Sequence, residues 1–100
     1  MSFDIIYARD ILKLAKIKNA IIIDIREKKE YEAEHMENAI NIPYENEKVY
    51  EKMLSKRRYY ILYCDRGGSS MKIARYLGRM GYKVATVIGG YDSIEKFVGK

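Results

Sequence analysis

The chain has 100 residues, with 19 lysines and arginines against 14 aspartates and glutamates, for a net charge of +5. This length fits one domain, over residues 1–100, that can form a small core without disulfides or metals. The composition is that of a soluble globular protein, 48% hydrophobic and 33% charged. Its apolar runs are far too short to span a bilayer. The positive charge favours anionic ligands without naming one.

A single cysteine, Cys64, cannot form a disulfide within the chain. The first residues also lack the basic-then-apolar pattern of a secretory signal. Both observations fit a reducing compartment, so we expect a cytoplasmic protein with no membrane partner.

The first half of the chain alternates between apolar strand patterns and more charged helical ones. A short strand is expected at 5–7, and the helix expected over 8–16 would place Ile11 and Leu12 on its apolar face. Residues 20–25 are apolar at successive positions, which is typical of a strand buried on both faces. The elements expected next are a helix over 27–34, a short strand at 39–42 and a helix over 45–54.

The second half repeats this alternation with a clearer pattern. Residues 59–63 and 84–88 are short, apolar and rich in β-branched or aromatic side chains, so both are expected to be buried strands. Between them, residues 70–80 have an amphipathic helical pattern that ends at Gly81. A last helix is expected over 91–98. The predicted fold class is therefore α/β, with a mostly parallel sheet of about five strands and helices on both faces.

The segment after residues 59–63 joins a cysteine to two glycines and two serines, as Cys64-Asp65-Arg66-Gly67-Gly68-Ser69-Ser70. A thiol there would face the free backbone N–H groups at a helix start, which together with the helix dipole stabilise a thiolate. The glycines permit positive φ, and either serine could cap the helix. The alternative is a buried structural cysteine beside an ordinary capped turn.

Two chemistries fit a thiolate surrounded by amides. Cysteine-dependent phosphatases and arsenate reductases use C-x-x-x-x-x-R, in which the arginine grips the transferred oxyanion. Here Ser70 holds that position, and the only loop arginine is Arg66. Sulfur transfer needs no such clamp, because a thiolate takes one sulfur from a donor and passes it on from a persulfide. The spacing therefore favours sulfur transfer.

Three motifs in the same order resemble the rhodanese-like sulfurtransferase family. The loop from Cys64 to Ser70 is similar to the family's active loop, C-x-x-G-x-[RS] followed by serine. Residues 24–43 resemble the upstream signature that begins with D-x-R and ends with proline, and residues 87–91 resemble the L-x-G-G segment before the last helix. The resemblance implies a single rhodanese-like domain with no cofactor and no metal.

The resemblance also implies a role for each matching residue. Cys64 would be the sulfur-accepting nucleophile, and Arg66 would attract the donor's anionic end. The charge of Asp65 would oppose the thiolate. The residues expected to bind substrate are Asp65, Arg66, Gly67, Gly68, Ser69 and Ser70. The residues expected to be structural near the site are Asp24, Arg26, Glu30 and His35, the last through packing and hydrogen bonding rather than as a general base.

Two positions depart from the family pattern. Glu34 stands where the family usually has glycine, so the turn before His35 is expected to differ. Ile94 stands where the family usually has tryptophan. Both positions lie in the scaffold, and neither departure removes a group that the chemistry requires.

The predicted activity is transfer of sulfane sulfur from thiosulfate or a similar anionic donor to cyanide, a thiol or a protein acceptor. Because the chain has no second cysteine, that acceptor must lie outside it. The alternative is a non-catalytic interaction or persulfide-carrier module. Lys72, Arg75 and Arg79 share a helical face that could contact RNA, but no RNA-binding motif accompanies them, so a solvated face is favoured and no nucleic-acid partner is expected.

Overall fold

Five parallel strands form one sheet in the computed structural model of the chain, which describes residues 3–98. The strands lie in the order β1-β5-β4-β2-β3. Their bounds are Asp4–Ile6 (β1), Ile21–Asp24 (β2), Ile40–Asn41 (β3), Tyr59–Tyr63 (β4) and Lys83–Val87 (β5). The helices are Ala8–Asp10 (η1, a 3-10 helix), Ile11–Lys18 (α1), Lys28–Ala33 (α2), Glu47–Met53 (α3), Gly68–Arg79 (α4) and Gly90–Val98 (α5).

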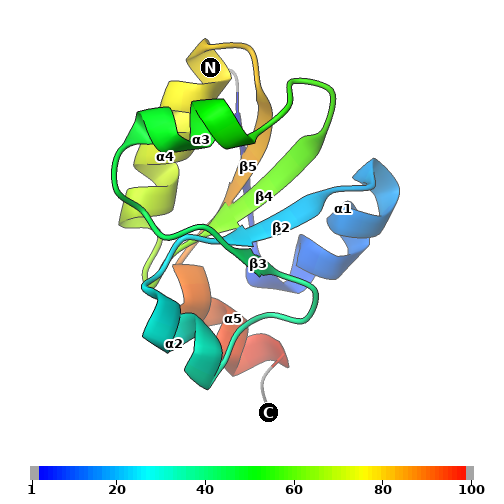
Figure 1. Ribbon diagram of the computed structural model, residues 1–100. Helices are drawn as coiled ribbons and strands as arrows, with labels where there is room; N and C mark the ends of the chain where they lie inside the picture. Colours follow the sequence, from blue (N-terminus) through cyan, green and yellow to red (C-terminus); the bar gives the residue numbers. More distant parts are fainter. Residues whose placement is uncertain (1–2, 99–100) are drawn as a thin grey trace.

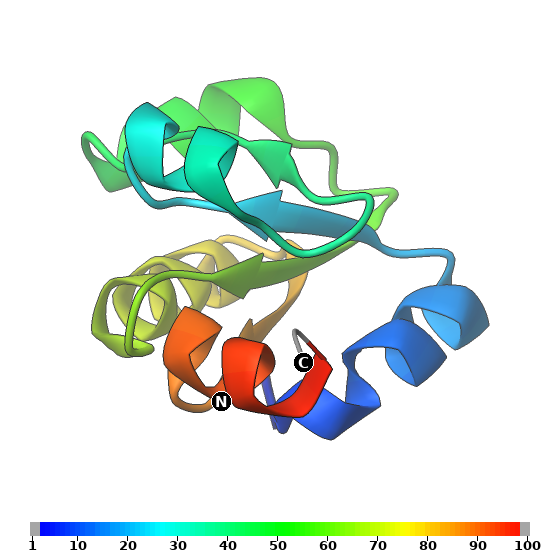
Figure 2. The same ribbon diagram turned by 90° about the horizontal axis from the view of Figure 1, so that it is seen from below.

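Helices cover both faces of this sheet, which confirms the predicted α/β class. α3 and α4 lie side by side (Figure 1) and pack around a core cluster that includes Tyr50, Ile73 and Leu77. Figure 2 shows α1 and α5 on the opposite side of the strands from α3, where Ile11 and Ile94 belong to a second cluster. Strands between two helical layers are apolar at successive positions, because each side chain meets a helix whichever way it points.

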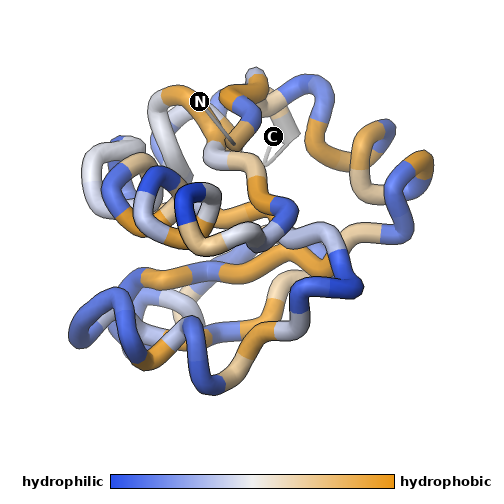
Figure 3. The backbone as a smooth tube through the Cα atoms, turned by 90° about the horizontal axis from the view of Figure 1, so that it is seen from above, coloured by the Kyte–Doolittle hydropathy of each residue, from blue (hydrophilic) through white to orange (hydrophobic). Residues whose placement is uncertain are grey.

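The hydropathy along the backbone follows the same layers. The central strands are hydrophobic along most of their length, whereas the helices alternate between hydrophobic and hydrophilic positions (Figure 3). Ile11 is fully buried, but Leu12 is 51% exposed, so the expectation that both face the core is wrong for Leu12. Successive helical residues point about 100° apart, and a short helix that centres Ile11 on the sheet turns Leu12 toward solvent.

Most predicted boundaries lie within one or two residues of the observed ones. The strand predicted at 59–63 is β4, with the same bounds. The helix predicted over 70–80 begins earlier, at Gly68. Across the described residues, none of the helices has the length and apolar character needed to cross a membrane.

The carboxyl ends of β2, β4 and β5 meet at one edge of the sheet, because neighbouring strands run parallel. Hydrogen bonds join the segments that follow these strands. The Ile25 N–H donates to the Tyr63 carbonyl at 3.0 Å, and the Tyr91 N–H donates to the Cys64 carbonyl at 2.7 Å. The edge where ligands bind in open α/β sheets is therefore formed by three connected segments, with Cys64 in the middle one.

Candidate active site

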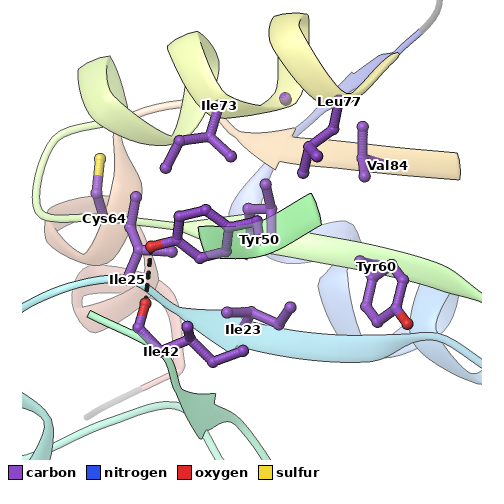
Figure 4. Packing of buried hydrophobic residues seen from close by; sticks show 11 residues of the cluster. Ile23, Ile25, Ile42, Tyr50, Tyr60, Cys64, Ile73, Leu77 and Val84 are labelled. Carbon is purple, nitrogen blue, oxygen red and sulfur yellow. Dashed lines mark hydrogen bonds between the residues drawn. The ribbon is translucent and has the colours of Figure 1, made fainter. Parts of the chain in front are cut away.

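Cys64 directly follows β4 and is 7% exposed. Figure 4 shows it at one end of the core cluster that packs under α4, with its sulfur directed toward the loop and the first turn of that helix. The apolar neighbours hold the side chain in place, while the sulfur itself meets polar groups. This is the arrangement of a positioned reactive group rather than of a small core hydrophobe.

Two backbone amides donate to the Cys64 sulfur. The Gly67 N–H lies 3.1 Å from Sγ, and the Ser70 N–H lies 3.4 Å from it. Both belong to the start of α4, where the first N–H groups have no partner inside the helix. Amide donors and the positive end of a helix dipole stabilise negative charge, so the two N–H groups can accommodate an anionic sulfur at this point.

The serines of the loop do not cap the helix, so that prediction is wrong. The N-cap is Gly67, which has no side chain, and Ser70 lies in the first turn of α4. Its hydroxyl is buried, 3.5 Å from the Cys64 sulfur, 3.3 Å from the Gly67 carbonyl and 2.7 Å from the Thr86 hydroxyl. The helix starts early because the sulfur satisfies amides that a serine would otherwise cap.

The two adjacent glycines of the loop have different conformations. Gly67 has φ of +102°, as predicted, but Gly68 is an ordinary first helical residue, so positive φ was wrongly expected for both. A third glycine, Gly90, has φ of +57°, and a Cβ there would lie 2.5 Å from the Cys64 carbonyl oxygen. Gly90 thus permits the close approach of α5 to the segment that carries Cys64.

Two adjoining cavities open on Cys64. The larger has a volume of about 530 Å³ and is lined by Glu30, Cys64, Asp65, Arg66, Gly68, Ser69 and Asp92. The second has a volume of about 350 Å³, shares Glu30, Cys64, Asp65 and Ser69 with the first, and adds Ile25, Arg26, Glu27, Pro43 and Tyr44. We call the buried group of Cys64, Gly67, Ser70 and Thr86 the floor, and the charged rim of Glu27, Glu30, Asp65, Arg66 and Asp92 the mouth.

Asp65 and Arg66 both lie at the mouth. The Arg66 side chain is 88% exposed, with its Nε 3.7 Å from an Asp92 carboxylate oxygen. Partial burial raises the pKa of the Asp65 carboxyl, and the neighbouring charge of Glu30 raises it further. The structure therefore brings the predicted loop residues together at one opening, with an acidic neighbourhood that the loop sequence alone does not reveal.

Asp24 and Arg26 form a buried ion pair behind the loop. Arg26 Nη2 lies 2.8 Å from Asp24 Oδ2, and its Nε lies 3.1 Å from both carboxylate oxygens. The same Nη2 donates to the Glu34 carbonyl at 2.7 Å, and the guanidinium stacks 4.1 Å from the Tyr91 ring centroid. These contacts tie the end of β2 to α2 and α5, as a structural charge pair does.

Glu30 and His35, also predicted as structural, have different surroundings. The Glu30 carboxylate accepts a hydrogen bond from the Glu27 N–H at 3.3 Å in a capping box, and it lines both cavities at Cys64. The His35 ring stacks on Tyr31 with centroids 3.8 Å apart and lines a separate cavity with Met36. Glu30 is thus placed to meet a substrate, whereas His35 is not placed as a base for Cys64.

Both departures from the family pattern fit the fold. Glu34 has φ of −170°, an extended conformation that any residue adopts, so the absence of glycine brings no strain there. Ile94 is a residue of α5, is 1% exposed and packs in the second core cluster. The turn and the last helix therefore form without the residues that the family usually has.

Several residues at the site were not singled out from the sequence. Asp92 lines the larger cavity, Thr86 supports the Ser70 hydroxyl, and Gly90 permits the contact with Cys64. The Gly89-Gly90 pair was a signal for the last of these. Asp92 and Thr86 carried no local signal, because an acid in a first helical turn and a threonine in a strand are both ordinary.

Comparison with known proteins agrees with this geometry. Residues 7–97 match the family model described as Rhodanese-like domain. The chain belongs to the rhodanese-like family. It is 32% identical over 82 residues to the thiosulfate sulfurtransferase GlpE of Coxiella burnetii, a match that covers 81% of this chain and 77% of the relative. It is also 32% identical over 74 residues to the thiosulfate sulfurtransferase PspE of Escherichia coli, covering 72% and 71%.

Solved structures of this family have the same fold. A rhodanese-related protein from Thermoplasma volcanium superposes with a TM-score of 0.78 at 27% identity, covering 93% of this chain and 91% of the other. The reduced CoADR-RHD protein of Bacillus anthracis gives 0.82 at 25% identity, where the match covers 93% of this chain but 16% of that larger protein. Membership of the rhodanese-like family and the floor geometry together support a sulfurtransferase.

Proposed function

We propose that this protein moves sulfane sulfur from thiosulfate or a similar donor to an outside acceptor through a persulfide on Cys64. The observation that carries the proposal is the pair of amides, from Gly67 and Ser70, that converge on a sulfur at the base of an open cavity. The names of the GlpE and PspE relatives point to the same donor.

The reaction has two displacements, and both balance without an added oxidant. In the first, the Cys64 thiolate attacks the outer sulfur of thiosulfate, a new S–S bond forms, and sulfite leaves with the electron pair of the broken bond. In the second, an acceptor thiolate or cyanide attacks the outer sulfur of the persulfide, and the Cys64 thiolate leaves. The floor amides stabilise the anionic sulfur at the start and end of the cycle.

The loop also explains why phosphate chemistry is not proposed. The position where cysteine-dependent phosphatases have arginine is Ser70, which is buried against Thr86. Arg66, the only loop arginine, is exposed and paired with Asp92 at the mouth. Neither of these two loop positions therefore offers the arginine that holds three phosphoryl oxygens in cysteine-dependent phosphatases.

Intact-mass spectrometry tests the proposal. After treatment with thiosulfate, the wild-type protein should gain one sulfur atom, which dithiothreitol removes, and Cys64→Ala should gain none. Unchanged mass in the wild type with thiosulfate and with persulfide donors would favour the alternative, a rhodanese-like interaction module without catalysis. Equal gain by Cys64→Ala would show that the sulfur binds elsewhere.

The compartment and the acceptor class remain predictions of the same proposal. A cytoplasmic location fits a thiol that must stay reduced between cycles. The absence of a cofactor likewise stays a prediction, since the two displacements require none.

A further inference from the structure

The charge around the opening of the Cys64 cavities is opposite to that of the whole chain. The chain has a net charge of +5. The two cavities, however, are lined by four carboxylates and two guanidinium groups. The carboxylates come from three separate elements, namely α2 (Glu30, with Glu27 just before it), the loop after β4 (Asp65) and α5 (Asp92).

Both guanidinium groups are already matched by an acid. Arg26 pairs with the buried Asp24, and Arg66 lies 3.7 Å from Asp92. In the described part of the chain, no further cation lines these cavities to offset the charges of Glu27, Glu30 and Asp65. The raised pKa of the Asp65 carboxyl agrees with this acidic neighbourhood, with partial burial as its first cause and the charge of Glu30 as its second.

This rim is not built as a metal site. Among residues 3–98, no group of three acidic, histidine or cysteine side chains is close enough to share an ion. The larger cavity is about 530 Å³ in volume, far more than a bare cation fills. The space suits an organic molecule or a chain segment that reaches the sulfur with its reactive group and meets the carboxylates with a cation.

We propose that the mouth selects sulfur acceptors whose thiol lies beside an ammonium or guanidinium group, with Glu30 and Asp65 as the specificity-determining residues. The proposal rests on the persulfide chemistry proposed above. The same acids repel a small dianion such as thiosulfate, so they slow the loading step and favour a cationic acceptor in the unloading step. An aminothiol and a protein cysteine flanked by lysine or arginine share this chemistry.

The unloading step fixes where the cation must lie. The acceptor thiolate attacks the outer sulfur of the Cys64 persulfide, an acceptor S–S bond forms, the Cys64 S–S bond breaks, and the Cys64 thiolate takes the electron pair. The attacking sulfur therefore stands above the floor, within the cavity that Glu30 and Asp65 share. A cation one or two carbons from that sulfur lies at the mouth.

The test measures unloading of a preformed persulfide in single turnover. The protein is loaded, freed of donor, and mixed with cysteamine, 2-mercaptoethanol or 3-mercaptopropionate at equal thiolate concentration. The rate for each thiol is divided by the rate at which the same thiol reacts with a small-molecule persulfide, and this ratio removes differences in intrinsic thiol reactivity. We expect the normalised rate to be highest for the cationic thiol cysteamine, lower for neutral 2-mercaptoethanol and lowest for anionic 3-mercaptopropionate. The spread, which is the ratio of the highest rate to the lowest, should be about tenfold and should shrink at about 0.5 M salt.

Variants locate the effect. Glu30→Gln and Asp65→Asn should each reduce the spread about threefold and speed loading by thiosulfate. Glu32→Gln is the matched control, because Glu32 lies on the same helix as Glu30 but pairs with Lys28 away from the cavities. Its spread should equal that of the wild type. Thermal unfolding of each variant verifies that the fold is retained.

The outcomes separate this proposal from the one on which it rests. Equal rates for the three thiols, or a fastest anionic thiol, overturn the mouth selectivity while the persulfide chemistry stands. Failure of every donor to load Cys64 overturns both. If a tripeptide with lysine on both sides of cysteine unloads the protein faster than cysteamine, the natural source is a protein. Equal rates for these two show that a small aminothiol suffices.

Discussion

The floor of the Cys64 cavity is buried and hydrogen-bonded, whereas its mouth is exposed and charged. Ser70 and Thr86 are 0% and 1% exposed, and their hydroxyls lie 2.7 Å apart behind the sulfur. Arg66, in the same loop, is 88% exposed and makes a long contact of 3.7 Å with Asp92. Buried polar contacts are costly to break, whereas exposed ion pairs are screened by water and salt. Changes at the floor should therefore act on the reaction and the fold, and changes at the mouth on the choice of partner.

Replacing Gly67 should give the largest effect. Gly67→Ala places a Cβ on a residue with φ of +102° and 3.2 Å from the Gly89 nitrogen, so we expect a loss of about 2 kcal/mol in the free energy of unfolding. The rate of persulfide formation should fall more than about tenfold, because the strained backbone moves the N–H of residue 67 away from the Cys64 sulfur. Denaturant unfolding and persulfide kinetics measure both losses.

Gly68→Ala is the control for that change. Gly68 has ordinary helical φ, and a Cβ there would meet no atom within 4 Å. We expect unchanged chemistry and a stability equal to or up to about 1 kcal/mol above that of the wild type. Equal losses in both variants would show that the floor does not depend on the conformation of Gly67.

Thr86 offers a smaller and more specific change at the floor. Thr86→Val keeps the shape of the side chain but removes the hydroxyl that lies 2.7 Å from Ser70 Oγ, so persulfide formation should slow about three- to tenfold. Thr86→Ser should restore the rate. Because the hydroxyl acts through Ser70, Ser70→Ala should lose its sensitivity to Thr86→Val. Additive effects in the double variant would place Thr86 outside the floor network.

Arg66 tests the mouth. Arg66→Gln removes an exposed cation, so the KM for thiosulfate should rise about two- to threefold at low salt while kcat stays within a factor of two. The difference should vanish at high salt, and the free energy of unfolding should stay within about 0.5 kcal/mol. A salt-independent loss of kcat would instead indicate direct contact of Arg66 with the reacting sulfur.

Asp65 gives the smallest expected effect in this series, a change in stability that is separate from its expected effect on the rates of loading and unloading. Its pKa is raised in the folded protein, so the folded state holds more protons than the unfolded state between the two pKa values, and stability falls as the pH rises through this range. Asp65→Asn removes that loss. At pH 7 we expect the free energy of unfolding of the variant to exceed that of the wild type by less than about 1 kcal/mol, because of solvent screening. This difference should disappear at acidic pH. Urea unfolding midpoints of both proteins across pH measure the difference.

The fold followed from the sequence wherever one local signal decided an element. The strand at 59–63 was predicted with its observed bounds, because five successive apolar residues, four of them β-branched or aromatic, have few alternatives. The start of α4 was misplaced, since serine is the ordinary capping residue and nothing local shows that a sulfur satisfies the amides at Gly67 and Ser70.

The sequence alone thus determined the local features from which sulfur transfer is predicted: a lone cysteine after a buried strand, two glycines, and Ser70 where cysteine-dependent phosphatases have arginine. Only the tertiary structure decided what surrounds that cysteine. Thr86 belongs to β5 and lies behind the sulfur, and Asp92 belongs to α5 and lines the cavity. The reason is physical, because the reactivity of a thiolate depends on adjacent amides that the local backbone supplies. The charge at the mouth depends on side chains that only the folded sheet brings together.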